Sequence, residues 1–205
     1  MAINEPVEVA ILAKAPVPGF AKTRLIPVLG PERAAFLQGQ LIERAAKTAA
    51  SATLGAVTLW GAPNASDPVF QEVCARHGFA LRPQPEGDLG ARMLAAVQAA
   101  NGPMLVIGTD CPTLTPRLLR TAADSLHSGT DVVLFPAEDG GYGLIGMSRA
   151  QPALFDSMPW GTPCVLGETR RRLMQLGLAW EEPALLWDLD VPADLGRLHG
   201  TDLMV

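Results

Sequence analysis

Cysteine and histidine are scarce in this chain of 205 residues, which contains three of each. The three cysteines (Cys74, Cys111 and Cys164) are odd in number and lie far apart, without the close spacing of metal ligands. We therefore expect reduced thiols in a cytoplasmic protein, and neither disulfides nor a cysteine-bound metal.

Long apolar runs and long basic runs are also absent. No run approaches the roughly 20 apolar residues of a membrane helix, and Glu8 and Lys14 interrupt the early stretch in which a signal peptide would lie. The net charge of −5 argues against nucleic acid as the principal partner. We expect a soluble, cytoplasmic protein that binds neither membrane nor nucleic acid.

The common catalytic patterns are missing as well. The chain has no G-x-x-x-x-G-K-[ST] or G-x-G-x-x-G loop, and no G-x-S-x-G or Ser-His-Asp pattern. What is present is a globular composition, 48% hydrophobic and 18% charged. The length suits one domain over residues 1–205.

Short apolar runs alternate with longer helical patterns along most of the chain. The expected strands are Val7–Ala13, Ala56–Trp60, Phe79–Arg82, Met104–Gly108 and Asp131–Phe135. The expected helices are Pro31–Ala50, Pro68–His77, Leu89–Ala100, Pro116–His127 and Val165–Leu176. This order predicts an α/β fold with a mostly parallel central sheet, helices on both faces and a more irregular α+β C-terminal part.

Ligands of such sheets bind beyond the carboxyl ends of the strands. Four turn-rich segments follow expected strands, namely residues 14–25, 84–90, 108–113 and 136–143. The first, "KAPVPGFAKTRL", concentrates positive charge in an acidic protein: Lys14, Lys22 and Arg24 could hold phosphate oxygens, and Gly19 would let the backbone approach them. The alternative is a solvated surface loop.

The other segments carry carboxylates and glycines. Asp110 follows an apolar strand and is placed to hold Mg²⁺, or else serves as a turn residue. Asp188 and Asp190 would face the same side of an extended segment. The alternative is that Asp190 or Asp194 caps a last helix around residues 192–199. Gly140 and Gly141 indicate either a tight turn or a close ligand. Trp160 would stack on a ligand or be a buried aromatic.

The motifs "KxPxPGxxKTRL", "GDLGxRM", "GTDCPxLT", "PAEDGGYxLIG", "WGT" and "DxDxPxDL" follow one another from about Val7 to Leu198. Together they resemble a bacterial family of unknown detailed function that is usually described as transferase or glycosyltransferase. That family lies within the nucleotide-diphospho-sugar transferase superfamily, the Rossmann-like GT-A fold. The resemblance extends more distantly to 2-phospho-L-lactate guanylyltransferase and molybdenum cofactor guanylyltransferase.

The resemblance implies roles for particular residues. Asp110, Asp188 and Asp190 would bind Mg²⁺ or Mn²⁺, and the catalytic residues would be Lys14, Lys22, Arg24, Asp110 and Asp139. The nucleotide would contact Lys14, Gly19, Lys22, Thr23, Arg24, Gly87, Asp88, Gly90 and Asp110. The acceptor would contact Gly140, Gly141, Tyr142, Trp160 and Thr162. The family usually has an aromatic residue where this chain has Gly143, which would widen the acceptor pocket.

The expected function is nucleotidyl transfer from a nucleoside triphosphate to a small phosphorylated acceptor. Such chemistry needs charge neutralisation and in-line positioning more than a covalent nucleophile. The alternative is glycosyl transfer from a nucleotide sugar, with Asp139 as the base. A second alternative is a non-catalytic nucleotide-binding protein. The partners would be a nucleotide and a small-molecule acceptor, and a homodimer is compatible with the sequence.

Overall fold

The structure is a computed structural model that describes residues 5–198 and 203. Its strands are β1 (Glu8–Lys14), β2 (Val57–Ala62), β3 (Ala80–Pro83), β4 (Met104–Ile107), β5 (Val132–Pro136), β6 (Tyr142–Met147) and β7 (Trp180–Glu181). Its α-helices are α1 (Ile26–Leu29), α2 (Pro31–Ala52), α3 (Pro68–His77), α4 (Leu89–Gln98), α5 (Pro116–His127) and α6 (Val165–Leu176). Three 3₁₀ turns complete it, η1 (Thr23–Leu25), η2 (Pro152–Leu154) and η3 (Pro192–Leu198).

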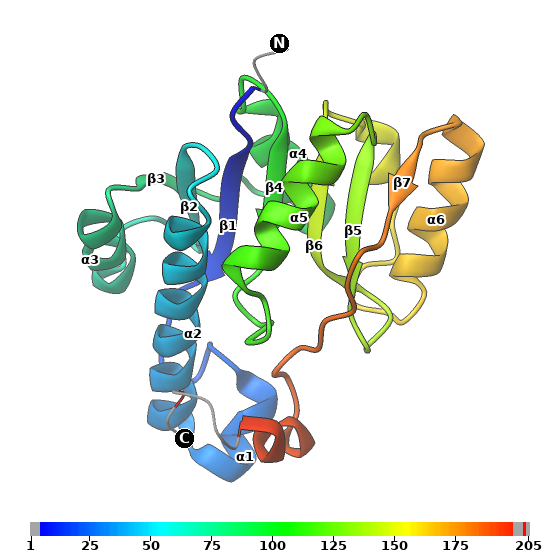
Figure 1. Cartoon of the computed structure of the whole chain (residues 1–205). Helices are drawn as coiled ribbons and strands as arrows, with labels where there is room; N and C mark the ends of the chain where they lie inside the picture. The colour runs from blue at the N-terminus through cyan, green and yellow to red at the C-terminus, as the bar shows by residue number, and fades with distance from the viewer. Residues whose placement is uncertain (1–4, 199–202, 204–205) are drawn as a thin grey trace.

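All seven strands form one sheet in the order β3-β2-β1-β4-β6-β5-β7 (Figure 1). Every neighbouring pair is parallel except those of β6, which runs antiparallel to β4 and β5. The predicted α/β fold with a mostly parallel sheet is therefore confirmed. The antiparallel insertion of β6 was not predicted, because a buried apolar run does not reveal its direction.

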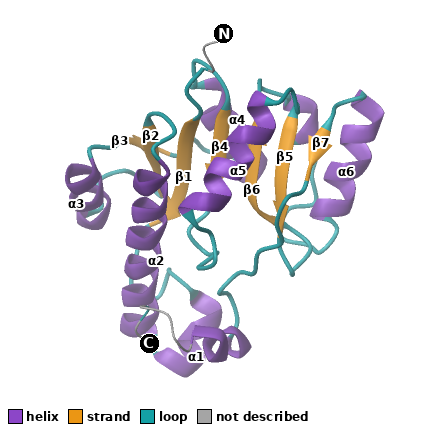
Figure 2. Cartoon of the chain, viewed as in Figure 1, coloured by secondary structure: helices purple, strands orange, loops and turns teal. Residues whose placement is uncertain are grey.

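Alternation along β1 divides the core into two layers. Val9 and Ile11 belong to the cluster that includes side chains of α2, α3 and α5, whereas Ala10 belongs to the cluster beneath α4 and α6. Figure 2 shows α2 and α5 in front of the sheet and α4 behind it. Side chains of a strand alternate between the faces, so an apolar run such as "VAILA" is buried on both.

A third, smaller hydrophobic cluster lies beyond the carboxyl ends of the parallel strands. It joins Leu25 of η1 and two leucines of α2 to the C-terminal segment through Trp187, Leu189, Leu198 and Leu203. Trp187 and Leu189 are buried in it, so the intervening Asp188 and the following Asp190 face the other side of an extended chain. This cluster fixes the basic loop and the late carboxylates to one another.

Polar side chains cap the N-termini of α3, α4 and α5. The carboxylate of Asp88 accepts from the amide of Ala91 at 2.8 Å, Asp67 accepts from Val69 at 2.9 Å, and the hydroxyl of Thr115 accepts from Leu118 at 3.3 Å. These contacts satisfy amides of the first turn that have no partner inside the helix. None of the helices in the described part of the chain is long and apolar enough to cross a membrane.

Candidate functional site

The C-terminal segment brings the late carboxylates to the loop that follows β4. The amide of Leu186 donates to the carbonyl of Pro136 at 2.8 Å, and the amide of Leu189 donates to the carbonyl of Asp110 at 2.8 Å. Residues 186–190 therefore run alongside the ends of β5 and β4. Asp188 and Asp190 thus lie near Asp110, although they are far from it in the sequence.

The ammonium of Lys22 lies between these carboxylates. Its Nζ atom is 2.6 Å from Oδ1 of Asp110, 3.1 Å from Oδ1 of Asp190 and 2.7 Å from the carbonyl oxygen of Leu189. The side chain of Lys22 is only 4% exposed. Its backbone has a φ of 46° and a ψ of 46°, a left-handed conformation that side chains other than glycine rarely adopt.

The charge of Lys22 is maintained by its neighbours. Burial lowers the pKa of this lysine, but the carboxylates of Asp110 and Asp190 more than compensate, so that its pKa lies above the ordinary value. Lys22 is therefore an ammonium with three oxygen neighbours. The ammonium of Lys22 is thus a buried cation of the site that the protein itself supplies.

The other basic residues of the loop are more accessible. Arg24 is 69% exposed and its Nη1 atom lies 3.7 Å from Oδ2 of Asp190. Lys14 is exposed at the end of β1, and Gly19 and Thr23 are exposed in the loop itself. The backbone of Gly19 has a φ of 83°, and a Cβ atom there would meet nothing within 4 Å. A ligand can therefore reach the backbone at this position.

Asp188 is bound to a cysteine. The thiol of Cys111 donates to Oδ1 of Asp188, with 2.7 Å between sulfur and oxygen. Burial, together with the charges of Asp139, Asp110 and Asp190, raises the pKa of Asp188 to about 6 against the opposing hydrogen bond from Cys111. Burial also raises the pKa of the Cys111 thiol, so Cys111 is a packed hydrogen-bond donor and no activated nucleophile.

Two buried polar residues that the sequence did not reveal hold this arrangement in place. The side-chain amide of Gln38, on α2, donates to the carbonyl of Lys14 and to the hydroxyl of Thr109, each at 3.2 Å. The hydroxyl of Thr109 in turn donates to Oδ1 of Asp110 at 3.2 Å. The one available signal was a glutamine within the apolar face of an amphipathic helix.

The glycines of "EDGGYG" serve the chain's own turns. Gly140 has a φ of 90°, and a Cβ atom there would lie 2.4 Å from the carbonyl oxygen of Pro163. Asp139 is exposed and accepts from the amide of Gly141 at 2.9 Å. Gly143 is buried in β6, where a Cβ atom would lie 2.3 Å from the sulfur of Cys111. The expectation that Gly143 widens an acceptor pocket is therefore wrong.

The second glycine of the motif "GDLGxRM", Gly90, packs against Trp160. A Cβ atom on Gly90 would lie 2.8 Å from Cζ2 of Trp160, and Trp160 also stacks on Phe155 and meets the edge of Tyr142. Gly87, with a φ of 115°, forms the turn before α4. Thr162 is exposed and donates to the carbonyl of Pro159 at 2.8 Å. Trp160 is half-buried, which leaves it little free face for a ligand.

A metal ion would have to share this site with Lys22. Among residues 5–198 and 203, no group of three or more His, Cys, Asp or Glu side chains is arranged to hold a metal ion. The oxygens of Asp110 and Asp190 that surround Lys22 are nevertheless the hard donors that Mg²⁺ and Mn²⁺ prefer. Mg²⁺ commonly takes one or two carboxylates and completes its shell with water and phosphate, which fits the residues present.

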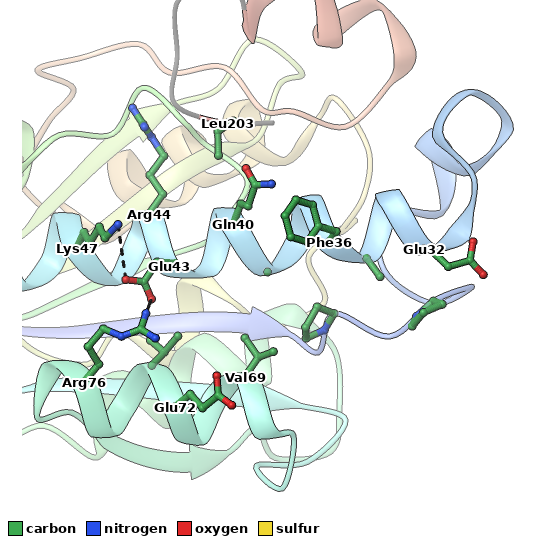
Figure 3. A pocket seen from close by; sticks show the side chains of 15 residues that line it. Glu32, Phe36, Gln40, Glu43, Arg44, Lys47, Val69, Glu72, Arg76 and Leu203 are labelled. Atoms are coloured by element: carbon green, nitrogen blue, oxygen red, sulfur yellow. Dashed lines mark hydrogen bonds and ion pairs between the residues drawn. The ribbon is translucent and has the colours of Figure 1, made fainter. Parts of the chain in front are cut away.

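A groove with a volume of about 590 Å³ lies elsewhere, between α2 and α3 (Figure 3). Glu43 on its floor forms ion pairs with Lys47 and Arg76, and the exposed ring of Phe36 lies along it. None of the residues assigned to the nucleotide, the metal or the acceptor lines this groove. It is separate from the carboxylate site.

Comparison with known families identifies the chain. A family described as an uncharacterized protein conserved in bacteria, DUF2064, matches residues 45–162. The chain belongs to this family. The matched segment of this DUF2064 protein includes Asp110, Asp139 and Trp160, whereas the basic loop and Asp188 and Asp190 lie outside it. No curated protein matches the sequence.

Solved structures share the fold over nearly the whole chain. A protein from Desulfovibrio desulfuricans G20, provisionally described as a nucleotide-diphospho-sugar transferase, is 25% identical with a TM-score of 0.84, covering 96% of this chain and 88% of its own. A nucleotidyl transferase from Methanothermobacter is 15% identical with a TM-score of 0.62, covering 95% and 96%. Glucosyl-3-phosphoglycerate synthase from Mycobacterium tuberculosis, solved with Mn²⁺ and UDP, is 13% identical with a TM-score of 0.57, covering 94% and 75%. The resemblance to the GT-A superfamily is confirmed.

Proposed function

We propose that this protein is a divalent-metal-dependent transferase that moves a nucleotidyl group from a nucleoside triphosphate to a phosphate of a small acceptor. The observation that carries the proposal is the meeting of Lys22 and Arg24 with Asp110 and Asp190 at the carboxyl ends of the strands. Positive groups that suit phosphate lie beside oxygen donors that suit a metal ion, which supports the proposal.

Each group has a distinct task in this reaction. An oxygen of the acceptor phosphate attacks the α-phosphorus, the bond from that phosphorus to the bridging oxygen of the β-phosphate breaks, and pyrophosphate leaves. Lys14, Lys22 and Arg24 neutralise the charge that builds up on the leaving pyrophosphate. Asp110 and Asp190, with Asp188 behind them, would hold the metal ion, which supplies Lewis acidity and orients the phosphates.

The transferase assignment is supported by what the similar structures are. The Methanothermobacter protein is a nucleotidyl transferase, and a further neighbour of the same fold is a CMP-2-keto-3-deoxy-manno-octonic acid synthetase bound to CTP. The exposed residues of the loop after β1 suit a triphosphate better than a neutral ligand. Gly19 also leaves its backbone accessible to phosphate oxygens.

Glycosyl transfer from a nucleotide sugar is the second candidate function. It is favoured by the Desulfovibrio protein, at 25% identity, and by the synthase bound to Mn²⁺ and UDP. In that reaction Asp139, exposed beside Asp188, would take the proton of the acceptor hydroxyl. Nucleotidyl transfer releases pyrophosphate, whereas glycosyl transfer releases a nucleoside diphosphate, so the products distinguish the two.

The test is a binding titration followed by product analysis. We expect one nucleoside triphosphate or nucleotide sugar from a panel to bind in a Mg²⁺- or Mn²⁺-dependent manner, and Asp110→Asn to abolish the metal dependence. Asp124→Asn, an exposed change on α5, is the matched control and should leave binding unchanged. Equal metal-dependent binding by wild type and Asp110→Asn would contradict the proposal. Pyrophosphate and nucleoside diphosphate are then measured with acceptors of each class.

A further inference from the structure

Lys22 does not lie where a phosphate-binding lysine of a free protein is expected. In the free protein, a lysine that binds only phosphate would extend into solvent, as Arg24 does with 69% of its side chain exposed. Lys22 is instead 4% exposed and takes three oxygen neighbours from the protein at 2.6–3.1 Å. Its ammonium therefore occupies the position that a metal ion would take between Asp110 and Asp190.

The backbone around Lys22 holds its side chain in this position. Lys22 has a left-handed φ of 46°, which is unfavourable for a residue with a Cβ atom. The loop is held on its far side by the burial of Leu25 against Leu189, next to the very carboxylates that Lys22 contacts. The ammonium and its oxygen neighbours thus form one built cation position, made from the beginning, the middle and the end of the chain.

We propose that Lys22 is an exchangeable internal cation: its ammonium fills the position between Asp110 and Asp190 in the free protein, a divalent metal ion displaces it, and the released ammonium then binds phosphate of the nucleotide. This inference rests on the proposed function. A divalent ion is preferred there by charge, because Lys22 and the exposed Arg24 are the two cations that face Asp110 and Asp190, and the carboxylates of Asp188 and Asp139 leave the site negative.

The exchange couples the metal to the nucleotide. Metal alone must displace an ammonium that then lacks a partner, so its affinity is low. When phosphate is present, the released ammonium gains a new anion, and both ligands bind more tightly together than apart. Thermodynamic linkage makes this coupling reciprocal. The exchange also explains how one residue can serve a metal site and a phosphate site in turn.

Lysine labelling tests the exchange in the unmodified protein. The chain contains the lysines Lys14, Lys22 and Lys47, and the exposed Lys47, which lies outside the proposed site, serves as the internal control. An amine-reactive acylating reagent followed by peptide mass spectrometry should label Lys22 about tenfold more slowly than Lys47 in the free protein. Addition of MnCl₂ should raise the rate at Lys22 severalfold without changing the control rate, and NaCl of equal ionic strength should not. Bound Mn²⁺ is measured on the same sample from the paramagnetic resonance of the free ion.

An unchanged rate at Lys22 under saturating Mn²⁺, or no binding of Mn²⁺ at all, would overturn the inference. Lys22→Met provides the second test, since it keeps an unbranched side chain only one atom shorter and removes the competing charge. Its affinity for Mn²⁺ without nucleotide should rise about tenfold. Arg24→Met, which removes a charge that does not fill the position, should change the affinity less. An affinity of Lys22→Met equal to or below wild type, in protein with a native circular dichroism spectrum, would contradict the exchange.

Neither experiment contains nucleotide, so the two proposals fail separately. If Mn²⁺ displaces Lys22 but no nucleotide binds, the transferase assignment and the phosphate step are wrong, and only the displacement of Lys22 by the metal stands. If Mn²⁺ alone binds while Lys22 stays protected, although nucleotide and metal bind together in a separate titration, the exchange is wrong and the transferase assignment stands.

Discussion

The buried amide of Gln38 donates a hydrogen bond to the hydroxyl of Thr109, with 3.2 Å between Nε2 and Oγ1. The same hydroxyl donates to Asp110, and the same amide also donates to the carbonyl at the end of β1. Helix α2 therefore sets the position of Asp110 through one threonine. An aspartate on a loop is fixed by such a relay more firmly than by the loop alone.

The first prediction removes this relay. Thr109→Val keeps the volume of the side chain but leaves the Gln38 amide with one acceptor fewer, which should cost about 1–2 kcal/mol of unfolding free energy. Metal-dependent nucleotide affinity should fall severalfold, because Asp110 keeps Lys22 but loses the donor that links it to α2. Thr48→Val is the control, since Thr48 is a buried threonine of α2 whose hydroxyl donates to the carbonyl of Leu114 at 3.4 Å and not to the carboxylate site. Urea unfolding and calorimetric titration are the measurements; equal nucleotide affinities in the two variants would rule out a positioning role for Thr109.

The second prediction concerns the guanidinium of Arg24. If Arg24 binds phosphate, Arg24→Ala should weaken nucleotide binding by roughly ten- to a hundredfold, because a charge-assisted contact is lost. Arg24→Lys should lose less, since it keeps the charge but not the two-pronged geometry. Stability should hardly change, as the side chain is 69% exposed.

Arg149→Ala is the charge-matched control for Arg24. Arg149 is exposed after β6, and because β6 is antiparallel its end lies at the opposite edge of the sheet. Binding isotherms for the three variants and wild type decide the matter. If Arg24→Ala binds nucleotide like Arg149→Ala, the loop has no role in phosphate binding.

Local chemistry made much of this fold predictable. Asp88 and Thr115 are residue types that favour N-caps and stand directly before two of the expected helices, and each accepts a hydrogen bond from the first turn of its helix. Helices α3 and α5 begin and end where the apolar spacing predicts, at Pro68–His77 and Pro116–His127. The antiparallel direction of β6 was not predictable, because it depends on which strands pair with β6 and leaves no signal in the residues of β6 itself.

The candidate site was predictable in its parts but not in its pairing. A basic loop and three carboxylates are visible in the sequence, yet the contact of Lys22 with Asp110 arises only when the third hydrophobic cluster folds. The resemblance implied a wider acceptor pocket at Gly143, and that expectation failed for the same reason, since the sulfur of Cys111 from a distant loop fills the space beside this glycine. Contacts between distant segments carry no local signal.

The third prediction separates two explanations of the glycines after Asp139. Gly140→Ala should lower the melting temperature strongly, because a Cβ atom would lie 2.4 Å from the carbonyl oxygen of Pro163 and the φ is 90°. Gly161→Ala is the control for backbone strain alone, with a φ of 75° and nothing within 4 Å. Gly141→Ala should be mild, as its nearest contact is Oδ1 of Asp139 at 3.2 Å. Melting curves in which Gly140→Ala matches Gly161→Ala would show that the packing against Pro163 contributes nothing.

The fourth prediction is a pH dependence of stability caused by Asp188. Burial raises its pKa to about 6 from an ordinary 3.8, and the neighbouring carboxylates contribute in the same direction. Between these two values the folded protein holds a proton that the unfolded chain has released. Stability from this group is therefore fully present below about pH 4 and is lost as the pH rises to about 6.

The variant Asp188→Asn isolates this effect, because it keeps the acceptor for Cys111 and cannot ionise. With EDTA present, its unfolding free energy should match that of wild type near pH 4 and exceed it by on the order of 3 kcal/mol at pH 7, since each pKa unit corresponds to about 1.4 kcal/mol. Asp139→Asn, an exposed carboxylate of the same cluster, should give a much smaller difference. The measurement is urea unfolding at intervals from pH 4 to pH 7. Parallel pH profiles for wild type and Asp188→Asn would mean that Asp188 is ionised at no cost in the folded protein, and that the carboxylates of the site already have a sufficient counter-charge in Lys22.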